Sequence, residues 1–273
     1  MFKSRLISGI LLLLMALVTV GSGGYILAAT LWFISIIAFH ELCLACKIQE
    51  NVKKQNTLEV VGYIFTSLYY IDMAVLKNQQ LMIMSVVMAL IVILMVYVFK
   101  FPKYHANQVM STYFSFIYAP VMFSFVYLTR ELEYGMYFVW MIFISSWISD
   151  TCAYCVGMLF GKHKLAPVLS PKKSIEGSIG GIAGSAIVGA LFGYFIVEHV
   201  ITEQQVTWVF ALIGAIGSVV SQIGDLAASA IKRNYEIKDY GKLIPGHGGI
   251  MDRFDSVLVT APMIYFLFTL FVK

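Results

Sequence analysis

The feature that most constrains this chain is a succession of long apolar segments that runs from one end to the other. Crossing a bilayer takes about 20 mainly apolar residues in a helix, because each residue rises about 1.5 Å and the hydrocarbon core is about 30 Å thick. Nine segments reach or approach this length: residues 6–21, 24–46, 57–76, 81–99, 108–128, 134–158, 178–198, 205–231 and 254–272. The sequence therefore predicts an all-α, polytopic integral membrane protein with about nine transmembrane helices.

The overall composition supports this fold class. Hydrophobic residues make up 60% of the 273 residues, and the mean hydropathy is +0.83. Such values are typical of polytopic membrane proteins and exceed what a soluble core needs. We expect a single integrated membrane unit, with N-terminal transmembrane helices in residues 1–140 and helices that carry the active site in residues 141–273.

The distribution of basic residues predicts the orientation. Lys and Arg in short loops stay on the cytoplasmic side. With the N-terminus inside, only Lys77, Arg130 and Lys273 of the 19 Lys and Arg residues fall on the outer side. We therefore expect a polar active-site cavity that faces the cytoplasm, in a protein of the cytoplasmic membrane. The net charge of +4 is too small and too uneven to indicate nucleic acid as a partner, and membrane lipid headgroups fit better.

Charge is concentrated in one stretch, Ser229 to Asp255, which we call the charged island. Together with Asp225 just before it, the island supplies Asp252 and Asp255, whose oxygens are the ligands that Mg²⁺ prefers. Its basic side chains suit phosphate oxygens: Lys232, Arg233, Lys238 and Arg253. The combination predicts phosphoryl or nucleotidyl transfer. A solvated loop with salt bridges is the alternative, and it is favoured for Glu236 and Lys242.

A stripe of polar residues leads into the island. Ser218, Ser221, Asp225, Ser229 and Lys232 are spaced 3, 4, 4 and 3 residues apart, which places them on one face of a helix. A polar stripe on a membrane helix is expected to line a cavity. The loop Gly161–Gly177, rich in lysine, is expected to meet an anionic ligand there.

Small residues recur along the seventh apolar segment. Its glycines are Gly177, Gly180, Gly181, Gly184, Gly189 and Gly193. Pairs of small residues four apart let helices approach closely, so the segment predicts tight helix packing. The same glycines could pack within one chain or between two chains of a homodimer.

Two Cys-x-x-Cys pairs invite a zinc or redox interpretation. Both pairs, Cys43 with Cys46 and Cys152 with Cys155, lie on predicted membrane helices without histidines at ligand spacing. Ordinary buried cysteines are the favoured interpretation.

The charged island resembles the signature of the phosphatidate cytidylyltransferase (CDP-diacylglycerol synthase) family. The matching residues are Ser229, Lys232-Arg233, Lys238-Asp239, Gly241, Pro245, His247-Gly248-Gly249, Asp252-Arg253 and Asp255. Gly224-Asp225-Leu226 and a polar block over residues 150–177 resemble the same family. The likeness is strong over residues 145–256 and only architectural over residues 1–140. One departure is Ala228, at a position that is acidic in many members, which weakens the case for a second-metal or nucleotide contact there.

The resemblance implies a magnesium-dependent membrane enzyme that forms CDP-diacylglycerol and pyrophosphate from CTP and phosphatidate. It assigns the metal ligands to Asp225 and Asp252 and leaves room for a second cation. Catalytic roles are expected for Asp225, Asp252, Lys232, Arg233, Lys238, Asp239, His247, Arg253 and Asp255. Substrate contacts are expected from Asp150, Lys172, Lys173, Ser174, Glu176, Ser221, Ser229, Gly248 and Gly249.

Two other functions remain open from the sequence. The first is a related lipid enzyme, such as a CTP-dependent polyprenol or phytol kinase, or a synthase that acts on an archaeal-type ether lipid phosphate. The second is an ion or metal transporter. A transporter needs ionisable groups at successive depths of the membrane, whereas here they cluster at the cytoplasmic helix ends.

Overall fold

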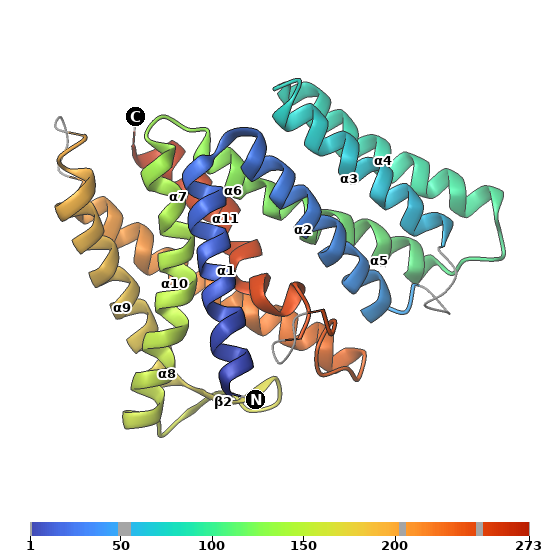
Figure 1. Cartoon of the computed structure of the whole chain (residues 1–273). Coiled ribbons are helices and arrows are strands. Elements are labelled where there is room, and N and C mark those ends of the chain that lie inside the picture. Colours follow the sequence, from blue (N-terminus) through green and yellow to red (C-terminus); the bar gives the residue numbers. More distant parts are fainter. Residues whose placement is uncertain (1, 49–55, 202–205, 244–247, 273) are drawn as a thin grey trace. The chain divides into compact units, whose positions relative to one another are not determined.

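The computed structural model describes residues 2–48, 56–201, 206–243 and 248–272 and is almost entirely helical (Figure 1). Its helices are α1 (Phe2–Ser22), α2 (Gly24–Ala45), α3 (Thr57–Ala74), α4 (Gln79–Phe99), α5 (Ala106–Phe116), α6 (Met122–Arg130), α7 (Gly135–Phe143), α8 (Ser149–Phe160), α9 (Ile175–Phe192), α10 (Thr207–Asn234) and α11 (Met251–Phe271). This confirms the predicted class. The exception is a small antiparallel hairpin of β1 (Lys164–Ala166) and β2 (Ser170–Ser174), which lies in a segment predicted as loop.

Three predicted spans are helical runs that contain a π-helical turn. The turns are η1 (Ile117–Val121), η2 (Ile144–Ile148) and η3 (Gly193–Val197). Pro120 lies inside η1, and a proline has no backbone N–H group to donate to the helix. The runs α5-η1-α6, α7-η2-α8 and α9-η3 thus form long continuous segments from shorter helices.

Seven of the described helices or runs are long and apolar enough to cross a membrane. They are Gly24–Ala45, Gln79–Phe99, Ala106–Arg130, Gly135–Phe160, Ile175–Val197, Thr207–Asn234 and Met251–Phe271. The described apolar part of α1, Gly9–Ser22, is shorter. The 18 residues of α3 include the carboxylates Glu59 and Asp72, which make it less apolar. The chain is a polytopic membrane protein, and the count of nine spans stays a prediction.

Packing divides the chain into two compact units. The first unit comprises Met1–Tyr127 and Tyr235–Arg253, and the second comprises Leu128–Asn234 and Phe254–Lys273. In the first unit α3 packs against α2 and α4, around a core that includes Phe39, Cys43 and Phe116. In the second unit α9 packs against both α8 and α10.

The glycines of α9 make close packing with α8 possible, as the sequence predicts. A Cβ atom on Gly177 would lie 2.6 Å from the Ala153 carbonyl oxygen, and one on Gly181 would lie 2.9 Å from the Ser149 carbonyl oxygen. Farther along, a Cβ atom on Gly189 would lie 2.6 Å from the carbonyl oxygen of Phe210. These contacts occur within one chain, so the glycine row gives no separate support for a homodimer.

Substituting Gly181 tests this packing. We expect Gly181→Val to destabilise the second unit by about 1–3 kcal/mol, because the added atoms would overlap the α8 backbone and force the two helices apart. Thermal unfolding of the purified protein in detergent measures the effect. Gly21→Ala is the control, since nothing lies within 4 Å of its added Cβ atom. Equal unfolding temperatures for both variants would contradict the packing role.

Candidate active site

The hairpin of the second unit carries two of the predicted substrate-binding lysines. β1 and β2 pair antiparallel, with Lys164 opposite Ser174 and Ala166 opposite Ser170. At the end of β2, the Ser174 hydroxyl accepts a hydrogen bond from the Gly177 backbone N–H at 3.1 Å. Ser174 is therefore the N-cap of α9, a position where serine is strongly preferred. The cap fixes the strand-to-helix junction immediately after Lys172 and Lys173.

Lys173 forms an ion pair with Asp225 of α10. Its Nζ atom donates to Asp225 Oδ2, and both side chains are 26% exposed. A carboxylate within a membrane helix is costly to bury unless a counter-charge or a cavity accompanies it. The hairpin supplies that counter-charge, which confirms the expectation that this loop faces the polar stripe.

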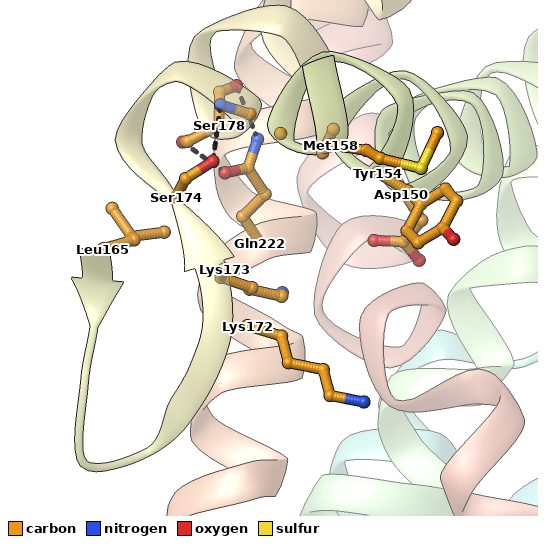
Figure 2. Close-up of a pocket in the computed structure, with 12 residues that line it drawn as sticks. Asp150, Tyr154, Met158, Leu165, Lys172, Lys173, Ser174, Ser178 and Gln222 are labelled. Carbon is orange, nitrogen blue, oxygen red and sulfur yellow. Dashed lines mark hydrogen bonds between the residues drawn. The ribbon is translucent and has the colours of Figure 1, made fainter. Parts of the chain in front are cut away.

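A cavity of about 270 Å³ lies between α8, the hairpin, α9 and α10 (Figure 2). Asp150, Lys172, Lys173, Ser178 and Gln222 line it with polar groups. Figure 2 shows the two lysine side chains extending toward the side on which Asp150 lies. The remaining lining is largely apolar and includes Ala153, Met158 and Leu165. The cavity therefore combines cationic groups with an apolar wall.

Three carboxylates from three helices interact electrostatically near this cavity. Asp150 of α8 interacts with Asp225 and with Lys173. Asp255 of α11, only 8% exposed, interacts with Asp225, with Asp150 and with Lys232 of α10. The structure thus brings together five of the residues that the sequence predicts for the site.

The close approach of α10 and α11 has a local cause. Gly224 precedes Asp225, and a Cβ atom on Gly224 would lie 3.1 Å from the Asp255 carbonyl oxygen. A larger residue would crowd this contact and separate the two carboxylates. Close packing of α10 against α11 therefore explains why a glycine occupies the first position of the Gly-Asp-Leu sequence.

The polar stripe on α10 differs from its predicted role over its first half. Ser218 and Ser221 are 0% exposed and do not line the cavity. Ser218 bonds to Ser149 of α8 at 2.7 Å. The Ser221 hydroxyl has no hydrogen-bond partner within the described part of the chain, and its predicted substrate contact stays a prediction.

Gln222 lines the cavity in place of these serines, and the sequence analysis missed it. Its Nε2 atom donates to the Ser178 carbonyl oxygen at 3.2 Å, and its Oε1 atom accepts from the Ser178 hydroxyl. Gln222 lies three residues before Asp225, so it shares the helix face of that carboxylate. This spacing is the signal that could have identified it.

Glu176 lies on the hairpin side of the α9 N-terminus and contacts protein groups. Its carboxylate bonds to His163 Nδ1 at 2.6 Å and accepts from the Lys162 backbone N–H at 3.1 Å. It therefore holds the chain that enters the hairpin, and it is not among the residues that line the cavity. On α10, Ser229 is half-buried and Arg233 is exposed.

The rest of the charged island belongs to the first unit. Asp252, in the first turn of α11, accepts through Oδ2 from the Tyr240 N–H at 2.8 Å and from the Gly249 N–H at 3.0 Å. Gly248 has φ = +85°, in the left-handed region that favours glycine. Lys238, Asp239 and Arg253 are exposed. His247, predicted as catalytic, lies outside the described residues.

The carboxylates at the cavity suit a divalent cation that takes most of its ligands from the phosphates of a bound substrate and from water. Asp225 is partly exposed and interacts with the other carboxylates. Within the ranges that the structure describes, no three His, Cys, Asp or Glu side chains are grouped closely enough to hold a metal ion. Mg²⁺ commonly binds through one or two carboxylates and completes its shell with phosphate and water. The residues present fit that type of site.

The cysteines are free thiols with differing exposure. Cys43 is buried, Cys46 and Cys152 are half-buried, and Cys155 is exposed. Burial raises the pKa of the Cys46 thiol, and a hydrogen bond with Tyr235 partly offsets that rise. The prediction of ordinary buried cysteines is thus confirmed for Cys43 and wrong for Cys155.

The fold and the site together define a polytopic helical membrane protein with a cavity lined by lysines and a carboxylate. The chain belongs to the cytidylyltransferase family, whose model matches residues 3–271. It is 32% identical over 270 residues to a phosphatidate cytidylyltransferase of Staphylococcus haemolyticus, covering 97% of this chain and 98% of that one. Phosphatidate cytidylyltransferases of Staphylococcus saprophyticus and Staphylococcus aureus are 31% and 32% identical over 265 residues, with the same coverage.

Proposed function

We propose that this chain transfers the CMP moiety of CTP to phosphatidate, giving CDP-diacylglycerol and pyrophosphate in phospholipid biosynthesis. The observation that carries the proposal is the Lys173–Asp225 pair beside a cavity whose lining combines two lysines with apolar side chains. A lipid phosphate needs both kinds of wall, since its headgroup is anionic and its glycerol and acyl parts are not. The names of the staphylococcal relatives and the complete signature in the charged island support the same reaction.

The chemistry that we propose is a direct displacement. The phosphate oxygen of phosphatidate attacks the α-phosphorus of CTP in line, the bond from that phosphorus to the bridging oxygen breaks, and pyrophosphate leaves. Phosphatidate is already ionised at pH 7, so a strong general base is unnecessary. Catalysis of such transfers depends mainly on positioning and on neutralising charge. Lys172 and Lys173 line the cavity, and in this proposal they bind phosphate oxygens.

Magnesium is the cofactor that we propose, with Asp225 as one ligand. When bound, Mg²⁺ would neutralise the negative charge that develops on the transferring group. Asp225 would hold the cation in place of its bond with Lys173, which would leave the Lys173 ammonium group to bind phosphate. We retain Asp252 as a separate assignment that rests on the family resemblance. A second cation and a homodimer remain predictions.

We propose that the protein resides in the cytoplasmic membrane with the active site facing the cytoplasm, where CTP is available. The support is the asymmetry of basic residues, of which only Lys77, Arg130 and Lys273 fall on the opposite side.

The position of the label in the product tests the reaction. Purified protein in detergent with Mg²⁺ and phosphatidate is supplied with CTP labelled either at the α-phosphorus or at the γ-phosphorus. We expect the α-label in CDP-diacylglycerol and the γ-label in pyrophosphate. A lipid product that carries the γ-label would instead identify a CTP-dependent kinase.

Removing single carboxylate charges tests the metal ligands. We expect Asp225→Asn and Asp252→Asn each to lower kcat at least a hundredfold, because the neutral amide binds Mg²⁺ poorly, while the unfolding temperature in detergent changes little. Magnesium titration of residual activity and of thermal stability would show weakened binding. Glu133→Gln is the control, since Glu133 is exposed in the segment between α6 and α7. A variant with near-normal turnover would exclude its residue from the metal site.

Cysteine accessibility tests the orientation. In a variant without the four native cysteines, Lys238→Cys is expected to react with a membrane-impermeant maleimide only in inverted membrane vesicles. Lys77→Cys is expected to react in intact cells. The reverse pattern would show that the orientation is wrong.

A further inference from the structure

Glu41 of α2 connects two parts of the first unit that lie far apart in the sequence. Its carboxylate accepts from the Ile250 backbone N–H at 3.1 Å and from the Met251 backbone N–H at 2.8 Å. The partners are 209 and 210 positions away, and Glu41 itself is only 4% exposed. Burying a carboxylate away from water is unfavourable unless hydrogen-bond donors replace the lost water, and the two backbone N–H groups do so here.

The start of α11 needs such an acceptor. The first backbone N–H groups of a helix have no partner within the helix, and a Ser, Thr, Asp or Asn side chain at the N-cap usually accepts from one of them. Ile250 occupies the position before Met251 and offers no side-chain acceptor. Glu41 supplies the missing acceptor from another helix, and its negative charge is favourable at a helix N-terminus.

The same carboxylate explains two glycines of the charged island. A Cβ atom on Gly241 would lie 2.7 Å from Glu41 Cδ, and one on Gly249 would lie 2.5 Å from the same atom. Either distance is a severe overlap. The glycines therefore leave the space that the Glu41 side chain occupies.

Asp252 completes the arrangement from within the island. It accepts from the N–H group of Gly249, which directly precedes Ile250, and from the N–H group of Tyr240. Two carboxylates thus hold four backbone N–H groups of one short region. We propose that Glu41 is a positioning residue for the transfer reaction, which fixes the backbone around Gly249 and thereby the orientation of Asp252.

This inference rests on the proposed function, since it gives Glu41 a role in that reaction through Asp252. A contribution to stability alone would be the simpler role for Glu41. The two roles differ in their kinetics. A positioning role lowers the kcat of the folded protein with little change in the KM for CTP, whereas a role in stability alone lowers only the fraction of protein that is folded. Both need the contact with Gly249: if the glycine exists to accommodate Glu41, then a side chain at position 249 should lower the kcat of the folded protein only while Glu41 is present.

A double-variant cycle separates these roles. We expect Glu41→Ala to lower kcat at least tenfold and Gly249→Ala to do the same. In the double variant, Gly249→Ala should cost less than a further twofold, because the space once filled by the carboxylate is empty. A second full tenfold loss would overturn the inference, because Gly249 would then have a requirement independent of Glu41.

Glu59 provides the matched control. It is another buried glutamate of the first unit, 0% exposed, and its carboxylate bonds to His40 on α2 at 2.5 Å and accepts from the Tyr63 hydroxyl. In a Glu59→Gln background the tenfold cost of Gly249→Ala should persist. Relief of that cost by Glu59→Gln would show a general loosening of the unit and would contradict the specific contact.

Hydrogen exchange supplies a measurement that does not depend on turnover. We expect the amides of Ile250 and Met251 to exchange at least tenfold faster in Glu41→Ala, and also in Glu41→Gln, which keeps the side-chain volume if the alanine variant folds poorly. Unchanged exchange in Glu41→Gln together with wild-type kcat would overturn the inference. A wild-type protein that makes no CDP-diacylglycerol would instead refute the proposed function, whatever the exchange result.

Discussion

The second unit depends on one electrostatic contact, the ion pair between Lys173 and Asp225. A carboxylate on a membrane helix is unfavourable without a counter-charge, and α10 itself carries no lysine beside Asp225. The counter-charge comes from a hairpin residue that lies 52 positions before Asp225 in the sequence. The glycine row of α9 brings that helix against α8, and the Ser174 cap fixes where the hairpin ends. The helix packing and the helix cap of this unit therefore together position Lys173 beside Asp225.

The first unit organises its share of the charged island by a different means. Here the carboxylates of Asp252 and Glu41 bind backbone N–H groups. Backbone donors hold a segment in one conformation, whereas exposed side chains such as Lys238 remain mobile in rotamer. The described part of the island thus combines backbone N–H groups held by carboxylates, at Tyr240 and Gly249–Met251, with exposed cations such as Lys238. This division suits a site in which phosphate groups must enter and pyrophosphate must leave.

Much of the fold and part of the site could be predicted from the sequence. The apolar segments correspond to helices because the length requirement of a bilayer is one-dimensional and can be seen without knowledge of contacts. Asp225 was identifiable as a lone carboxylate in an apolar helix. Glu41 was not, because its partners are backbone groups about 210 positions away that no residue pattern reveals. Gln222 was missed because a neutral amide on a helix that already carries Asp225 adds no signal of its own. The burial of Ser221 could not be predicted, because helical spacing gives the face of a residue but not its depth in the packing.

The charges at the cavity bear on the proposed need for a cation. Asp150, Asp225 and Asp255 contribute three negative charges, and Lys172, Lys173 and Lys232 contribute three positive ones when all six groups are ionised. The cluster is therefore balanced without substrate. CTP and phosphatidate together add several negative charges. At an effective dielectric constant of about 20, two negative charges 4 Å apart repel each other by on the order of 4 kcal/mol unless a cation offsets the repulsion. Turning Lys173 toward phosphate offsets little of this cost, because it leaves the Asp225 carboxylate without its counter-charge. The proposed divalent cation at Asp225 would meet both demands, since it would take the place of Lys173 at the carboxylate and would add positive charge beside the phosphates.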